Sequence, residues 1–196
     1  MRLSTCFTLQ ERRLFSLAML HDVLGALENS TIEKTVIVAS DSEVQECVKD
    51  FGMTFLKETR QGLNPALKQA TQWCIRRKAE GVLILPADLP LMTPADVDHL
   101  VKLGQKNSLV AAPSRNGGTN ALLQIPAAII SPSFGVDSFS KHLKAARAKM
   151  AETKVYVSSG LMLDMDSEED LGQLLKRGTQ TESYRFLKQR TNNGHN

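Results

Sequence analysis

The chain has 196 residues, of which 42% are hydrophobic and 23% are charged. This composition supports an apolar core and excludes a wholly disordered chain. The formal net charge of +3 is small, and the 24 Lys and Arg residues form no clustered run against the 21 Asp and Glu. A nucleic-acid-binding surface is therefore not indicated. The balance is equally compatible with a small anionic substrate.

Three cysteines, Cys6, Cys47 and Cys74, are far apart and odd in number. Their spacing argues against a zinc knuckle and against a disulfide framework. No apolar stretch approaches the ~20 residues that a membrane-spanning helix needs. The amino terminus also lacks the charged-then-apolar pattern of a signal peptide. We therefore expect a cytoplasmic protein with no membrane segment.

Helical and extended segments alternate along the first half of the chain. From Leu9 to Leu27, apolar residues recur at helical spacing, and Thr8 with Glu11 forms a capping box before them. The elements expected next are a buried strand over 34–40, a helix from Asp41 to Phe51, a short strand over 53–56, a helix that opens at Gly62 or Asn64 and runs to about Ala79, and a strand over 81–85.

The alternation continues in the second half. Thr93, with Pro94 at the first helical position, starts a helix. The elements expected after it are strands over 108–112 and 121–125, a helix over 136–150, an extended segment over 154–157, and a helix from its cap Ser167 to about Lys176. From Gly178 the sequence is polar, and residues 179–189 can form a peripheral helix.

This order of elements predicts an α/β fold, a three-layer sandwich with a mainly parallel central sheet and right-handed crossovers. No repeat, linker or low-complexity segment divides the chain. We therefore expect a single domain over residues 1–178 and a polar carboxy-terminal tail over residues 179–196.

Asp88 follows the apolar run 81–85 and lies between Pro86 and Pro90, which restrict the backbone on both sides. In an open parallel sheet, ligands bind beyond the carboxyl ends of the strands. A carboxylate at that place can bind a hard cation such as magnesium. The alternative is a simple cap of a turn or helix.

A second acidic site comprises Asp164 and Asp166, which lie on the same side of an extended segment. Alternating carboxylates of this kind can hold a cation, most convincingly together with Asp88. The alternative is that Asp166 or Ser167 caps the following helix, whose positive end favours acidic residues.

Two glycine-containing segments are candidate anion sites. In the first, residues 116–120 (NGGTN), the paired glycines let the backbone approach a ligand, and their N–H groups can cradle an anion. In the second, residues 133–139, Gly135 and Ser138 flank a helix start, where phosphate or carboxylate can bind. A plain hairpin turn, and a cap made by Asp137, are the respective alternatives.

The histidines carry no such signal. His21, His99 and His142 fall on expected helices without metal-like spacing, and His195 lies in the tail. We interpret them as surface or internally satisfied residues. The sequence also has no G-x-S-x-G elbow and no P-loop.

With these segments identified, the sequence resembles the 2-phospho-L-lactate guanylyltransferase family over about residues 2–175. A carboxylate-Leu-Pro after a strand and a D-x-D before a helix occur in many nucleotidyltransferases, whereas G-G-T-N followed by F-G-x-D-S-F is far more specific. The matching stretches are 86–93 (PADLPLMT), 113–123 (PSRNGGTNALL), 134–139 (FGVDSF) and 163–171 (LDMDSEEDL).

The resemblance implies a nucleotide-diphospho-sugar transferase (GT-A-like) fold and transfer of a guanylyl group from GTP to 2-phospho-L-lactate or a close phospho-acid such as phosphoenolpyruvate. Pyrophosphate is released, and the product feeds coenzyme F-420 biosynthesis. The implied cofactor is Mg²⁺, bound by the catalytic Asp88 with Asp164 or Asp166. The residues implied to hold the acceptor acid are Thr119, Gly135 and Ser138, with Gly118 and Asn120 beside them. The residues implied to lie beside the nucleotide are Arg2, Asn64 and Asp88.

The chemistry agrees with the implied roles. The acceptor phosphate is already an anion, so no activating base is required, and catalysis depends on positioning and charge neutralisation. Members of the family begin with a strand and a basic loop that end in an R-L-S-like sequence, which corresponds here to residues 2–4. The alternatives are therefore a molybdopterin or sugar nucleotidyltransferase and a truncated, non-catalytic relative. A homodimer is compatible with the resemblance.

Overall fold

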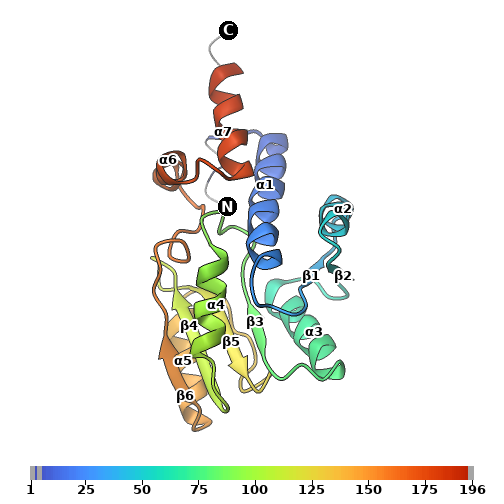
Figure 1. Cartoon of the computed structure of the whole chain (residues 1–196), viewed down its shortest axis with the longest axis vertical. Coiled ribbons are helices and arrows are strands. Elements are labelled where there is room, and N and C mark those ends of the chain that lie inside the picture. Colours follow the sequence, from blue (N-terminus) through green and yellow to red (C-terminus); the bar gives the residue numbers. More distant parts are fainter. Residues whose placement is uncertain (1–2, 4–5, 194–196) are drawn as a thin grey trace.

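The computed structural model describes residue 3 and residues 6–193, with the side chains of 192 and 193 left aside. Its helices and strands alternate through most of the chain, which confirms the α/β class (Figure 1). In chain order the elements are α1 (Leu9–Glu28), β1 (Val36–Ala39), α2 (Ser42–Asp50), β2 (Thr54–Lys57), α3 (Leu63–Arg76), β3 (Val82–Ile84), α4 (Pro94–Leu103), β4 (Ser108–Pro113), β5 (Thr119–Ile125), α5 (Ser138–Ala148), β6 (Glu152–Val155), α6 (Glu168–Arg177) and α7 (Glu182–Asn193).

The strands form a parallel pair, β1 with β2, and a four-stranded sheet in the order β3-β5-β4-β6. The pairing is mixed, in place of the mainly parallel sheet expected. Strand β5 runs antiparallel to both β3 and β4, while β4 and β6 are parallel. The physical reason is the short turn between β4 and β5, since a connection of that length joins antiparallel strands only.

Helices cover both faces of the four-stranded sheet. Val110 packs with Val23 of α1 and Leu100 of α4 in one buried cluster, whereas the adjacent Leu109 packs with Leu143 of α5 in another. Successive strand residues point to opposite faces, so one apolar run serves both layers. The three-layer arrangement is therefore confirmed.

Strand β1 is less buried than its sequence predicts. All four of its residues are only half-buried, so the expectation of a fully buried strand over 34–40 is wrong. Within the described part of the chain, β1 pairs only with β2 and β3 pairs only with β5. One edge of each strand therefore has no neighbouring strand to cover it.

Helix starts follow the capping chemistry that the sequence indicates. Thr8 and Glu11 form the expected capping box before α1. Thr93 caps α4 with Pro94 at its first turn, and Ser167 caps α6. Side-chain oxygens thereby accept hydrogen bonds from amides that have no partner within the helix.

The polar segment after Gly178 forms α7, which lies beside α1 (Figure 1). Its Leu187 belongs to the same buried cluster as Phe15 of α1. Asp22 of α1 accepts hydrogen bonds from the Ser183 amide at 3.0 Å and from the Glu182 amide at 2.6 Å. Helix α7 is therefore anchored by both apolar packing and a carboxylate at its amino-terminal end. Among the described residues, no helix is both long and apolar enough to cross a membrane.

We predict that Asp22→Ala loosens α7. The substitution leaves the amides of residues 182 and 183 and the buried Ser183 hydroxyl without their acceptor, a loss on the order of 1–3 kcal/mol. Hydrogen exchange should accelerate over residues 182–193, and Asp50→Ala at the exposed end of α2 is the matched control. Unchanged exchange in α7 would count against this anchor.

Candidate active site

Asp88 lies in the loop that follows β3, and its backbone joins this loop to the second acidic segment. The amide of Met165 donates to the Asp88 carbonyl oxygen at 3.2 Å. The neighbouring side chains Leu89 and Met165 are both completely buried, so apolar packing fixes the two segments on either side of this hydrogen bond.

The Asp88 carboxylate lies in an unfavourable environment for a charge. Its Oδ1 atom is buried and has no hydrogen-bond partner among the described residues. Burial raises the pKa of Asp88 to about 6, and the negative charges of Asp164 and Asp166 add to the increase. The three carboxylates expected from the sequence therefore lie within electrostatic reach of one another.

These side chains do not make a complete metal cage by themselves. Within the described part of the chain, no group of three or more His, Cys, Asp or Glu side chains is close enough to hold a metal ion. Magnesium commonly takes only one or two protein carboxylates and completes its coordination with water and substrate phosphates. The unpartnered Oδ1 of Asp88 fits such an open site, and the metal-binding roles of Asp88, Asp164 and Asp166 stay predictions.

Strand β5 connects the acidic residues to the glycine-containing turn. Because β5 runs antiparallel to β3, with Leu122 opposite Ile84, the start of β5 lies at the end of β3 that leads to Asp88. The Asn120 side-chain amide donates to the Leu161 carbonyl at 2.8 Å and makes a long 3.4 Å contact with Oδ1 of Asp164. Asn120 thus links the predicted acceptor segment to the D-x-D segment.

The turn between β4 and β5 is closed from within. The Gly118 amide donates to the Ser114 hydroxyl at 2.9 Å, and the Ser114 amide donates to the Gly118 carbonyl at 2.9 Å. A Cβ atom on Gly118 would lie 2.8 Å from that hydroxyl, so the turn requires glycine there. The Gly118 amide is therefore engaged inside the turn, in place of the anion contact expected for it.

A second clamp holds this turn against α6. Arg115 forms an ion pair with the buried Asp170, which also accepts hydrogen bonds from the amide and hydroxyl of Ser167. Sequence analysis missed both clamp residues, because Arg115 and Asp170 are 55 positions apart. The clamp places the glycine-containing turn beside the acidic segment.

The acceptor residues gather where this turn meets the start of α5. The Phe139 amide donates to the Gly117 carbonyl at 3.3 Å, and the Thr119 and Ser138 hydroxyls are 3.1 Å apart. Gly135 has a φ of +129° with open space where a side chain would lie, a conformation that other residues rarely adopt. The structure therefore brings Thr119, Gly135 and Ser138 together, and their contact with substrate stays a prediction.

His142 belongs to this group, although sequence analysis set it aside. It is completely buried, its Nδ1 lies 3.0 Å from the Thr119 hydroxyl, and its Nε2 lies 3.0 Å from the Ser133 amide. Burial lowers the pKa of His142 to about 4. The signal available in the sequence was its position four residues after Ser138, which places both on one face of α5.

The two residues expected beside the nucleotide have different outcomes. Asn64 accepts a hydrogen bond from the Phe134 amide at 2.7 Å and donates to the Phe134 carbonyl at 3.1 Å. Its side chain therefore supports the segment that carries Gly135, and its nucleotide contact stays a prediction. Arg2 lies outside the described residues.

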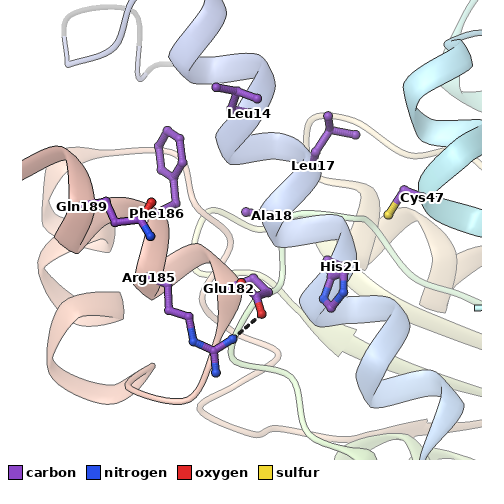
Figure 2. Close-up of a pocket in the computed structure, with 9 residues that line it drawn as sticks. All are labelled: Leu14, Leu17, Ala18, His21, Cys47, Glu182, Arg185, Phe186 and Gln189. Atoms are coloured by element: carbon purple, nitrogen blue, oxygen red, sulfur yellow. Dashed lines mark hydrogen bonds and ion pairs between the residues drawn. The ribbon is translucent and has the colours of Figure 1, made fainter. Parts of the chain in front are cut away.

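A separate hollow lies between α1, α2 and α7 (Figure 2). Its volume is about 480 Å³, and it contains none of the residues predicted for the active site. The residues that line it are Leu14, Leu17, Ala18, His21, Cys47, Glu182, Arg185, Phe186 and Gln189. Its lining offers no cluster of carboxylates, so the candidate active site is the region around Asp88.

We predict that Asp88→Asn stabilises the metal-free protein at neutral pH. The pKa of Asp88 is higher in the folded chain than its ordinary 3.8, so its contribution to the free energy of unfolding falls as pH rises from about 4 through about 6. Removing the charge should restore about 1–3 kcal/mol at pH 7 and nothing below pH 4. Urea unfolding without divalent cations measures the difference.

The exposed Asp50→Asn is the control for this measurement and should show no pH-dependent difference from the wild type. An Asp88→Asn protein that is no more stable than the wild type at pH 7 would contradict the strained environment described for this carboxylate.

Relatives and solved structures agree with this geometry. The chain is 34% identical over 189 residues to the 2-phospho-L-lactate guanylyltransferase of Methanobrevibacter smithii, an alignment that covers 96% of this chain and 83% of that protein. It is 36% identical over 188 residues to the 2-phospho-L-lactate guanylyltransferase of Methanothermobacter thermautotrophicus, covering 95% and 83%.

The fold is also found in distant proteins. A protein from Desulfovibrio desulfuricans G20 assigned to the nucleotide-diphospho-sugar transferases superposes with a TM-score of 0.79 at 16% identity, covering 97% of this chain and 87% of that one. A 4-diphosphocytidyl-2C-methyl-D-erythritol synthase superposes with a TM-score of 0.63 at 13% identity, covering 80% and 88%. The expected GT-A-like architecture is thereby confirmed.

The sequence family is decided by a match along nearly the whole chain. Residues 1–192 match the model of the family described as guanylyl transferase CofC like, in agreement with the two archaeal relatives. The chain therefore belongs to the CofC-like guanylyl transferase family.

Proposed function

We propose that this protein transfers a guanylyl group from GTP to 2-phospho-L-lactate, with release of pyrophosphate, as a step in coenzyme F-420 biosynthesis. The names of its relatives support the reaction. The structural observation that carries the proposal is the contact between the two halves of the site: Asn120, next to the acceptor residue Thr119, reaches Asp164 of the acidic segment.

The proposed reaction joins two anions. An oxygen of the acceptor phosphate attacks the α-phosphorus of GTP, and the bond from that phosphorus to the bridging oxygen breaks. The electron pair leaves with pyrophosphate, and a new diphosphate linkage joins the guanylyl group to the acid. Because the nucleophile is already ionised, the site needs orientation and charge compensation more than a general base.

The acidic residues fit a magnesium ion. Asp88 would hold it through the unpartnered Oδ1, with Asp164 or Asp166 as the second carboxylate. A magnesium ion there would offset negative charge on the α-phosphate and on the leaving pyrophosphate. In its absence the three carboxylates repel one another and would also repel the triphosphate, so the apo site is poorly suited to GTP.

The acceptor side supplies hydroxyl groups and an open backbone position. Thr119 and Ser138 form the floor of this region, since they are 5% and 1% exposed. Gly135 leaves room for the acid above them. Phosphoenolpyruvate differs from 2-phospho-L-lactate mainly in hybridisation, so it is the other acceptor that these residues would accommodate.

We further propose a cytoplasmic location, which the cysteines support because no disulfide joins Cys6, Cys47 and Cys74. A homodimer stays a proposal that rests on the family resemblance alone.

We predict that GTP with 2-phospho-L-lactate and magnesium gives the fastest pyrophosphate release in a panel of GTP, ATP, CTP and UTP against phospho-acids. Asp88→Asn should lower this rate by about two orders of magnitude or more, because removal of even an outer contact of a metal site costs 10–100-fold. The exposed Asp50→Asn is the control.

A protein that accepts a sugar phosphate or a pterin but no phosphorylated three-carbon acid would refute the proposed substrate. Unchanged pyrophosphate release by Asp88→Asn would refute the assignment of the metal site.

We also predict that Thr119→Val and Ser138→Ala weaken the acceptor more than the nucleotide. Loss of a hydrogen bond to an anion should raise the KM for the acid by about 10-fold or more, while the KM for GTP stays within about twofold. Thr71→Val, which removes a buried hydroxyl of α3 bonded to the Leu67 carbonyl, is the matched control. Equal increases in both KM values would argue against acceptor roles.

A further inference from the structure

A line of hydrogen-bonding groups runs beneath the proposed acceptor site. It begins at the Ser133 amide, passes through both nitrogens of the His142 ring, and continues to the hydroxyls of Thr119 and Ser138, with separations of 3.0, 3.0 and 3.1 Å. All but Ser133 are at least 95% buried. Water therefore competes little for these groups, and the proton positions follow from the partners on the page.

The first partner decides the state of the ring. A backbone amide can only donate, so the Ser133 N–H requires Nε2 of His142 to accept. The neutral ring then carries its proton on Nδ1, and this N–H donates to the Thr119 hydroxyl oxygen. Burial, which lowers the pKa of His142 to about 4, favours the same neutral form.

The direction of that second hydrogen bond leaves one hydroxyl proton unused. Thr119 and Ser138 have two hydroxyl protons between them, and only one can lie in the 3.1 Å contact that joins their oxygens. The ring takes neither, since its Nδ1 donates. Among the described residues, no further acceptor contacts these hydroxyls, so the second O–H is available to a ligand.

The opposite tautomer would remove this capacity. If Nδ1 accepted from Thr119, then Ser138 would donate to Thr119 and both protons would be bound within the protein. An anionic ligand would then meet oxygen lone pairs alone, which repel it.

We infer that His142 is a positioning residue of the acceptor site, whose Nδ1–H tautomer orients the Thr119–Ser138 pair so that one hydroxyl proton is presented to the anionic phospho-acid. The inference rests on the proposed function for the identity of the ligand. The arrangement of protons in the ligand-free protein does not depend on it.

Two substitutions separate this role from packing, because each keeps a different half of the ring's hydrogen bonding. In His142→Asn, the shorter amide can still donate to Thr119 near the position of Nδ1. In His142→Gln, the longer amide can still accept from Ser133 near the position of Nε2. Both replace a buried ring by a smaller amide, so their stabilities should fall similarly.

We expect His142→Gln to raise the KM for the acid by about tenfold, the loss of one hydrogen bond to an anion, with the KM for GTP unchanged. His142→Asn should stay within about threefold of the wild type. In a Thr119→Val background, His142→Gln should add no further loss, since His142 acts through that hydroxyl. The exposed His99→Asn on α4 is the control. Equal losses in Asn and Gln variants, or a full additional loss in the Thr119→Val background, would overturn the inference.

A measurement on the wild type covers the case in which the variants fold poorly. Nitrogen-15 NMR of the four histidines should show one ring that is neutral with its proton on Nδ1, whose signals shift on addition of 2-phospho-L-lactate and are insensitive to GTP. A ring protonated on Nε2 would overturn the inference whether or not the protein transfers guanylyl groups. Failure of guanylyl transfer with the Nδ1 tautomer present would instead refute the proposed function alone.

Discussion

The arrangement of the site depends on holding three carboxylates near one another against their mutual repulsion. Asp88 illustrates the cost, since its buried Oδ1 has no hydrogen-bond partner and its pKa is raised to about 6. Charged groups in such surroundings destabilise a folded protein unless a counter-charge is present. A site of this kind is suited to a cation and to the phosphate groups that accompany it.

The scaffold supplies the opposing forces through rigid connections. The hydrogen bond from the Met165 amide to the Asp88 carbonyl joins two loops whose apolar neighbours are buried. The Arg115–Asp170 pair then ties the hairpin turn to α6. Because a buried carboxylate without its partner is strongly unfavourable, this pair keeps the turn in one place. Acidic and acceptor segments that are remote in the chain are thereby held in register.

The acceptor half relies on neutral polar groups instead of charges. His142, Thr119 and Ser138 are buried and mutually hydrogen-bonded, and a network satisfied in this way is rigid. A cationic side chain at this position would bind any anion, including the triphosphate of GTP. Oriented hydroxyls discriminate by geometry, which helps to keep the two anionic substrates in separate places.

Local patterns in the sequence were sufficient for the order of helices and strands, for the capping residues Thr8, Thr93 and Ser167, and for the carboxylate at the end of a core strand. These features depend on neighbours within a few positions, so hydrophobic period and capping chemistry reveal them. The mixed pairing of β5, the half-buried state of β1 and the Arg115–Asp170 pair depend on which distant segments meet. His142 shows the difference most clearly: its position on a helix was legible in the chain, but only the packing of α5 against the hairpin placed its ring between Ser133 and Thr119 and so determined which nitrogen carries the proton.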